Sequence, residues 1–280
     1  MKYINHSIIK KIHRKRKLES HKGDYGRILC IGGSEDYPGA PYLAVNAAIS
    51  ALRSGVDLVT IASPKKVAYA INALNPDIIS KKFDCTYFTQ RQSSEIVELS
   101  KLYDCILIGP GIGQEKQTAL FVNEVIKEID KPTVIDADAI KVIKLQNISN
   151  SILTPHIKEL EILLQNSNIS INENKELQKY LTTNVLLLKN NIDTIISDTK
   201  INYNKTGNPG MTVGGTGDIL SGLAAGFVAQ KNNLLDSASA AAYLSGYIGD
   251  QLFEQFGYSF IASDFLDRIG IAIKSILDKN

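Results

Sequence analysis

The segment of this sequence best suited to chemistry is a glycine-rich run that ends in an acid. Residues 204–218 read Asn-Lys-Thr-Gly-Asn-Pro-Gly-Met-Thr-Val-Gly-Gly-Thr-Gly-Asp, and apolar residues at helical spacing follow Asp218. Glycines let the backbone approach a ligand closely, and a helix N-terminus presents free N–H groups at the positive end of its dipole. The run therefore predicts an anion hole, a set of backbone amides that suits a phosphoryl group.

Asp218 stands at the mouth of this anion hole, and two roles are open to it. It could cap the helix or serve as a first-turn acid. It could also take a proton from a hydroxyl that attacks a phosphoryl group held by the same amides, and the glycines before it favour this role. A carboxyl with the ordinary pKa of about 4 is a weak base at pH 7, which suffices for a loose, metaphosphate-like transition state. The run is not a Walker loop, because no Gly-Lys-Ser/Thr follows.

The elements that must position this acid alternate along the chain between short apolar runs and longer amphipathic stretches. Strands are expected at Arg27–Gly32, Asp57–Ile61, Cys105–Gly109, Thr133–Asp136, Ser151–Thr154, Val185–Lys189 and Thr194–Ser197. Helices are expected at Gly39–Ser54, Gln117–Glu128, Lys158–Gln165 and Asp218–Gln230, besides a first helix with Ile4, Ile8, Ile9 and Ile12 as its apolar stripe. Several strands are continuously apolar, as strands buried on both faces of a parallel sheet are. The alternation predicts an α/β fold, a three-layer α/β/α sandwich with a mainly parallel sheet. With no linker to divide it, residues 1–280 are expected to form a single domain.

Glycines, acids and a histidine fall where these strands end. Gly32-Gly33, Gly109–Gly113, Asp136-Ala137-Asp138 and Thr154-Pro155-His156 each follow an expected strand. Ligands of open α/β sheets bind at the carboxyl ends of the strands, so a shared cleft is expected there. Asp136 and Asp138 could position the metal of a nucleotide or cap the next helix. His156 could be a structural hydrogen-bonding residue or bind substrate.

Composition excludes several classes of protein. Among 280 residues, 31 Lys and Arg oppose 29 Asp and Glu, and the formal charge of +2 argues against a dedicated nucleic-acid binder. No apolar run reaches the length of about 20 residues that a membrane span needs. The three cysteines lack ligand-like spacing, which suggests reduced thiols. Since the N-terminus also lacks the apolar core of a signal peptide, a cytoplasmic location is expected.

Together these segments resemble those of the ADP- or ATP-dependent NAD(P)H-hydrate dehydratases of the ribokinase-like superfamily. The matching segments are His21–Arg27, Gly32–Ser34, Tyr37–Ala40, Gly109–Gly113, Asp136–Ala139, Leu153–His156 and Thr206–Asp218. They run in the family order over nearly the whole chain. The resemblance implies a ribokinase-like fold and repair of hydrated NADH or NADPH. Enzymes of the family transfer a phosphoryl group from ADP or ATP to the C6 hydroxyl of the S epimer, and phosphate then leaves.

The resemblance also implies roles for single residues. Asp218 would deprotonate the C6 hydroxyl, and Glu159 would act on Mg²⁺ through water, or be only an exposed first-turn acid. The hydrate pocket would be lined by Ala40, Gly111, Gly113 and His156, together with Asp218. The nucleotide and its transferred phosphoryl group would be contacted by Lys189, Asn190, Asn191, Ile192, Asp193, Gly215, Thr216 and Gly217.

The chain departs from the family pattern at a few positions. Ile157-Lys158 replaces the usual Pro-Gly, and Asn190 replaces a glycine whose positive φ an asparagine could adopt. Ser245-Gly246 replaces the usual His-Gly. None of these changes touches Asp218 or the glycines before it.

Two further functions compete with the dehydratase. A ribokinase-superfamily kinase for a small vitamin precursor would share Asp218 and the glycines, but would release a stable phosphate ester. A non-catalytic nucleotide sensor would have no need of the acid. By resemblance, the expected partners of the dehydratase are hydrated NADH or NADPH, ADP or ATP, further copies of the chain in a homo-oligomer, commonly a tetramer, and a separate epimerase.

Overall fold

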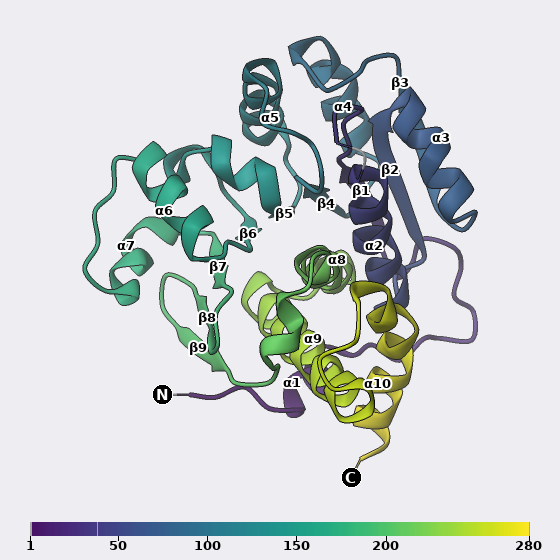
Figure 1. The fold of residues 1–280 in the computed structure, drawn as a ribbon, viewed down its shortest axis with the longest axis vertical. Coiled ribbons are helices and arrows are strands. Elements are labelled where there is room, and N and C mark those ends of the chain that lie inside the picture. The colour runs from purple at the N-terminus through teal and green to yellow at the C-terminus, as the bar shows by residue number, and fades with distance from the viewer. Residues whose placement is uncertain (1, 38, 280) are drawn as a thin grey trace.

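The computed structural model describes residues 2–37 and 39–279, with the backbone alone of residues 40 and 41. The described helices and strands alternate along most of the chain, as the sequence predicts (Figure 1). The strands are β1 (Arg27–Ile31), β2 (Leu58–Pro64), β3 (Ile79–Phe83), β4 (Cys105–Ile108), β5 (Thr133–Ile135), β6 (Ser151–Leu153), β7 (Val185–Leu188), β8 (Asp193–Ile196) and β9 (Ile201–Asn204). The α-helices are α1 (Ser7–Ile12), α2 (Ala40–Arg53), α3 (Lys65–Leu74), α4 (Ser93–Ser100), α5 (Lys116–Glu128), α6 (Ile157–Asn166), α7 (Gln178–Leu181), α8 (Thr216–Ala229), α9 (Leu234–Phe256) and α10 (Leu266–Asp278).

The strands join in one sheet in the order β3-β2-β1-β4-β5-β6-β7-β8-β9. Every pairing from β3 to β7 is parallel, and only β7–β8 and β8–β9 are antiparallel. The predicted mainly parallel sheet is therefore confirmed. All seven predicted strands are present, with ends that differ by a few residues.

The two strands that the sequence did not reveal lie at the two edges of the sheet. The edge strand β3 exposes Lys81 and Lys82, and β9 is only half-buried over most of its length. An edge strand that meets water carries polar side chains, so it lacks the continuous apolar run that marks a central strand.

Alternate residues of the central strands supply the two hydrophobic cores. Ile28 and Cys30 of β1 belong to the core under α2, α8, α9 and α10, while Leu29 and Ile31 belong to the core under α4, α5 and α6. Helices thus cover both faces of the sheet, as the predicted three-layer sandwich requires (Figure 1). The apolar stripe of the first helix is confirmed in part: Ile9 and Ile12 are buried and Ile8 packs against the same core, but Ile4 precedes the helix, which begins at Ser7.

Helix α8 packs against α2 through glycines that leave no room for a side chain. A Cβ atom on Gly222 would lie 2.0 Å from Ser50 Oγ, and one on Gly226 would lie 2.0 Å from Ser54 Oγ. This close approach fixes the position of α8, and with it the position of Asp218 in the first turn. Among the described residues, no helix is long and apolar enough to cross a membrane.

Candidate active site

The predicted site residues gather at the carboxyl edge of the parallel strands. Because β1, β4, β5, β6 and β7 are parallel, the segments that follow them all emerge at this edge. They are Gly32-Gly33, Gly109–Gly113, Asp136–Asp138, Thr154–His156 and Lys189. The sequence-based expectation of one shared location is met for these segments.

The loop Gly109–Gly113 is clamped between the ends of β1 and β5. Gly109 has a φ of 129°, and a Cβ atom there would lie 1.9 Å from the carbonyl oxygen of Asp136. The Gly33 N–H donates to the Pro110 carbonyl at 3.0 Å, and the Gly113 N–H donates to Asp138 Oδ2 at 3.2 Å. Asp138 therefore holds the glycine loop in place.

Lys189 lies between two buried carboxylates. Its Nζ is 3.2 Å from Asp136 Oδ1 and 3.7 Å from Glu159 Oε2. Thr154 Oγ1 also donates to Asp136 Oδ1, at 2.7 Å. Burial acts to lower the pKa of Lys189, but the charges of Asp136 and Glu159 outweigh it and the pKa is raised. The side chain is therefore a permanent ammonium ion at neutral pH.

The N-terminus of helix α8 lies beside the ammonium group of Lys189. The N-cap residue is Gly215, in the left-handed region with a φ of 98°, and a Cβ atom on Gly217 would lie 3.5 Å from Lys189 Nζ. In the described part of the chain, the backbone N–H groups of Gly215, Thr216 and Gly217 make no hydrogen bond. The free amides and the ammonium ion have the arrangement that an anion hole requires, which is the site that the glycine-rich run predicts.

Asp218 is only 8% exposed in the first turn of α8. Burial raises its pKa to about 8, the charge of Asp136 acts in the same direction, and Lys189 opposes them. The N-cap is Gly215, so the alternative that Asp218 caps the helix is wrong, whereas its place as an acid of the first turn is confirmed. The ordinary pKa assumed from sequence is also wrong, because sequence does not report burial.

His156 and Glu159 cap helix α6 reciprocally. His156 Nδ1 accepts from the Glu159 N–H at 3.3 Å, and Glu159 Oε2 accepts from the His156 N–H at 3.0 Å. Glu159 is 4% exposed, so the alternative of an exposed first-turn acid is wrong. The imidazole of His156 is half exposed at the edge of the site. It can serve as a cap and still face a ligand.

The donor set at this edge fits an ion held largely through water. The described residues contain no group of three or more His, Cys, Asp or Glu side chains arranged to hold a metal. Asp136 and Glu159 nevertheless face the anion hole with Lys189 between them. Mg²⁺ is commonly bound through one or two carboxylates, several waters and the phosphates of a substrate, which this pair can provide.

Residues 28–270 match the model of the NAD(P)H-hydrate dehydratase family. The chain belongs to this family. The bifunctional NAD(P)H-hydrate repair enzyme Nnr of Methanothermobacter thermautotrophicus is 39% identical over 266 residues, which cover 91% of this chain and 51% of that protein. The ADP-dependent (S)-NAD(P)H-hydrate dehydratase of Nitrosopumilus maritimus is 32% identical over 98% of this chain and 97% of that protein.

Solved structures agree with the assignment to the NAD(P)H-hydrate dehydratase family. The ADP/ATP-dependent NAD(P)H-hydrate dehydratase of Bacillus subtilis, co-crystallised with ATP/Mg²⁺, has a TM-score of 0.78 at 25% identity, over 98% of each chain. The fold is therefore ribokinase-like, as the resemblance implies. The chain spans about half the length of several curated relatives that it matches, whose names describe them as bifunctional.

In this NAD(P)H-hydrate dehydratase family member, three of the predicted nucleotide contacts lie in the turn between β7 and β8, and a fourth, Asp193, is the first residue of β8. Asn190, Asn191 and Ile192 are exposed there. Asp193 Oδ1 accepts from the Asn190 N–H at 3.1 Å, and Asp193 Oδ2 accepts from Asn204 at 3.0 Å. Asn190 is not among the residues with a positive φ, so that expectation is wrong. Asp193 thus shapes the turn, whereas Lys189 is the member of this set that reaches the anion hole.

Some residues that shape the site carried no predicted role. Asp250 of α9 accepts from the Gly207 N–H at 3.0 Å and from Asn208 Nδ2 at 3.2 Å, which anchors the loop before Gly215. The signal in the sequence was an acid directly after Gly249, at the end of the small and apolar stretch of this helix. The predicted contact Ala40 is the first residue of α2, and its side chain lies outside the described residues.

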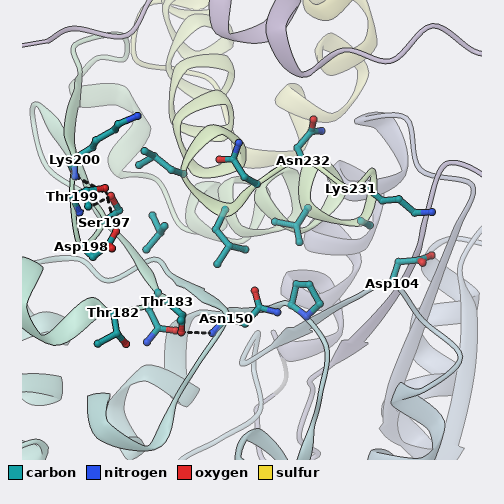
Figure 2. Close-up of a pocket in the computed structure, with 18 residues that line it drawn as sticks. Asp104, Asn150, Thr182, Thr183, Ser197, Asp198, Thr199, Lys200, Lys231 and Asn232 are labelled. Atoms are coloured by element: carbon teal, nitrogen blue, oxygen red, sulfur yellow. Dashed lines mark hydrogen bonds between the residues drawn. The ribbon is translucent and has the colours of Figure 1, made fainter.

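A cavity of about 730 Å³ lies at the opposite, amino edge of the sheet. Figure 2 shows Lys200 and Asp198 on one side of it and Lys231 and Asp104 on the other. None of the predicted site residues lines this cavity. The chemistry expected of the family is therefore concentrated at the carboxyl edge.

Proposed function

We propose that this chain repairs damaged nicotinamide cofactor by dehydrating the S epimer of hydrated NADH or NADPH, with ADP or ATP as the phosphoryl donor. The observation that carries the proposal is one buried carboxyl, Asp218, in the first turn of α8 beside free backbone amides and the Lys189 ammonium ion. Family membership and the names of two relatives support the choice of substrate and donor.

Asp218 is the general base of the proposed reaction. Its carboxylate takes the proton from the C6 hydroxyl of the hydrate, and the hydroxyl oxygen attacks the terminal phosphorus of the donor nucleotide. The bond from that phosphorus to the bridging oxygen of the nucleotide then breaks, which releases AMP from ADP or ADP from ATP. A pKa of about 8 makes the ionised carboxylate a stronger base than an exposed aspartate.

Lys189 and the amides of Gly215, Thr216 and Gly217 hold the phosphoryl group during transfer. Preorganised donors of this kind stabilise the charge of the transition state without any reorganisation at the moment of reaction. The carboxylates of Asp136 and Glu159 keep the Lys189 ammonium ion charged and fixed. Gly111, Gly113 and His156 line the hydrate side of the site, with Asp138 holding the glycine loop.

Elimination completes the reaction. The phosphate ester at C6 is a good leaving group, and the electrons of the ring nitrogen expel it as inorganic phosphate. Loss of a proton from the neighbouring ring carbon then restores the double bond of NADH or NADPH. Glu159, with Asp136 beside it, would hold Mg²⁺ through water, and when bound this ion neutralises phosphate charge.

The test is an assay on authentic S-hydrate with Mg²⁺ and either ADP or ATP. The wild-type chain is expected to restore the absorbance of reduced nicotinamide with at least one donor. Asp218→Asn is expected to fold and to lose at least about a hundredfold in kcat, the usual contribution of a general base. No restored absorbance with either donor would refute the proposal. A phosphate ester that accumulates instead would identify a small-molecule kinase.

Assembly and location complete the proposal. We infer that residues 1–280 act as one domain, because the described strands all join one sheet. The S epimer is supplied by an epimerase that interconverts the two hydrates, and the chain works in the cytoplasm, where nicotinamide cofactors and nucleotides are both present. A homo-oligomer, with four copies as the expected number, is testable by light scattering.

A further inference from the structure

A buried carboxamide in helix α2 has no hydrogen-bond partner. Asn46 is 1% exposed, and both its Nδ2 and its Oδ1 are unpaired among the described residues. Most buried polar side chains are hydrogen-bonded, and an unpaired one carries its full desolvation penalty. Ser50, one turn further along the same face of α2, is also buried, but its hydroxyl donates to the Ala47 carbonyl at 2.9 Å, whereas Asn46 has no such partner in the part of the chain that the structure describes. Such a group calls for a physical explanation.

Asn46 lies directly behind the anion hole. A Cβ atom on Gly215 would lie 3.3 Å from Asn46 Nδ2. The packing of α2 on α8 gives the same location, because Ser50 faces Gly222 and Ser54 faces Gly226 in successive turns. One turn earlier on both helices, Asn46 falls opposite Asp218. The carboxamide therefore borders the backbone that binds the phosphoryl group, on the side turned away from solvent.

The peptide between Gly214 and Gly215 lies next to Asn46, and of these two glycines Gly214 has free space around it whereas Gly215 does not. Gly214 is exposed, and a Cβ atom there would meet nothing within 4 Å. Gly215 is confined by Ala262 as well as by Asn46, since its Cβ position lies 2.9 Å from Ala262 Cβ. A small rotation at Gly214 can therefore move the Gly214–Gly215 peptide relative to the carboxamide while Gly215 stays in place.

We propose that Asn46 is a positioning residue of the anion hole, whose carboxamide hydrogen-bonds the Gly214–Gly215 backbone when a phosphoryl group occupies the amides of Gly215, Thr216 and Gly217. The inference rests on the proposed function, because it takes these amides as the phosphoryl site. A group that is unpaired in the free state and paired in the bound state shifts the equilibrium towards the bound state. In the free protein, Asn46 is buried without a hydrogen-bond partner among the residues described, which is unfavourable. Binding of a nucleotide with a transferable phosphoryl group relieves this penalty, and the relief adds to the affinity for that nucleotide.

The test compares nucleotides that fill the anion hole with one that does not. ADP and ATP carry a terminal phosphoryl group, whereas AMP is what remains of ADP after transfer. Dissociation constants of the three nucleotides with Mg²⁺ are measured by calorimetry for the wild-type chain and for Asn46→Ala. The variant is expected to bind ADP or ATP roughly tenfold more weakly, the worth of one hydrogen bond to a charged or polarised site, with AMP unchanged.

Two further variants separate positioning from packing. Asn46→Ser keeps a hydrogen-bonding group and is expected to recover part of the lost affinity, even if Asn46→Ala folds poorly. Ser50→Ala lies one turn further along the same buried face, opposite Gly222, and is expected to leave all three dissociation constants unchanged. In turnover, Asn46→Ser is expected to raise the KM of the donor more than it lowers kcat.

If Asn46→Ala weakens the binding of AMP and ADP equally, the proposed role of Asn46 is overturned and Asn46 is only a packing residue. The same follows if the variant binds all three nucleotides as the wild type does and only its Tm is lower. A wild-type chain that binds ADP or ATP yet converts no hydrate would refute the proposed function alone, since the ratio of the ADP and AMP constants still decides the role of Asn46. A wild-type chain that binds none of the nucleotides would overturn both.

Discussion

At the scale of single residues, the site is an arrangement of one ammonium ion among three carboxyl groups. Lys189 contacts Asp136 and Glu159 directly, and its charge acts on Asp218. Negative charge is therefore in excess around the base, which raises its affinity for a proton. Lys189 counteracts this effect, so the side chain that we propose as a phosphoryl-binding group also lowers the pKa of the proposed base.

The pH dependence of turnover follows from this arrangement. Asp218 acts as a base only when ionised, so kcat/KM of the wild-type chain is expected to rise with pH, to reach half its maximum at the pKa of about 8 and to level off above it. Lys189→Met removes the charge that lowers this pKa, so the rise is expected to move to higher pH, with weaker nucleotide binding. Lys189→Arg keeps the charge and is the matched control. Identical pH profiles for Lys189→Met and the wild type would contradict the coupling.

The sequence singles out Asp218 as the proposed base, but it does not predict the environment of this residue. Asp218 was identifiable because glycines precede it and an apolar helix follows. Its raised pKa comes first from burial and then from the charge of Asp136, which is distant in sequence and is brought near only by the order of the strands. Asn46 was not predicted for the same reason, since nothing in α2 indicates that α8 begins beside it.

At the scale of elements, the position of the base depends on how closely α8 packs on α2. A Cβ atom on Gly222 would lie 2.1 Å from the carbonyl oxygen of Ala47, a backbone atom that cannot move aside. The two helices would have to separate to admit a side chain. Because Asp218 lies one turn before Gly222 on the same helix, any such shift also moves the base.

Gly222→Ala is therefore expected to destabilise the chain and to slow turnover. The expected loss is about 1–3 kcal/mol in the free energy of unfolding, the usual cost of overpacking, measured by urea denaturation. Gly270→Ala in α10 is the matched control, because its Cβ position has nothing within 4 Å. The control is expected to gain about 0.5–1 kcal/mol from the better helix propensity of alanine. Similar effects of the two substitutions would contradict the packing argument.

The strands could be predicted where the burial of their side chains produces a continuous run of apolar residues in the sequence. The central strands β1 and β4 are apolar, apart from the exposed Arg27 at the start of β1, because helices cover both faces, and their ranges followed from that pattern. The edge strands β3 and β9 were not found, since their side chains meet water as well as the core. The turn at Asn190 differed from expectation because the Asp193 side chain, rather than a positive φ, closes it.

At the scale of the whole molecule, the net charge of +2 says little about the ligand. Positive potential for a polyphosphate comes instead from oriented amides and one ammonium ion at the carboxyl edge. The site is assembled from segments between Gly32 and Asp218, so it exists only when the complete sheet has formed. The free energy of unfolding is therefore linked to the protonation state of Asp218.

This linkage predicts that the active-site acid costs stability as pH rises. In the unfolded chain an aspartate has a pKa of about 3.9, whereas folding raises that of Asp218 to about 8. Between these values the folded chain holds a proton that the unfolded chain has released, so its contribution to stability falls with rising pH and is constant outside this window. Asparagine has the same shape and no proton to lose.

Asp218→Asn is therefore expected to be more stable than the wild type, by a margin that widens from pH 5 to pH 8 and then stays constant. The free energies of unfolding of both chains are compared by urea denaturation at several pH values across this range. Asp198→Asn, an exposed substitution at the opposite edge of the sheet, is the control and is expected to show no such widening. A constant difference between Asp218→Asn and the wild type at every pH would mean that folding leaves the affinity of Asp218 for its proton unchanged. The raised pKa of Asp218 thus has two effects: it lowers the stability of the wild type above pH 5, and it makes the carboxylate the stronger base that the proposed reaction uses.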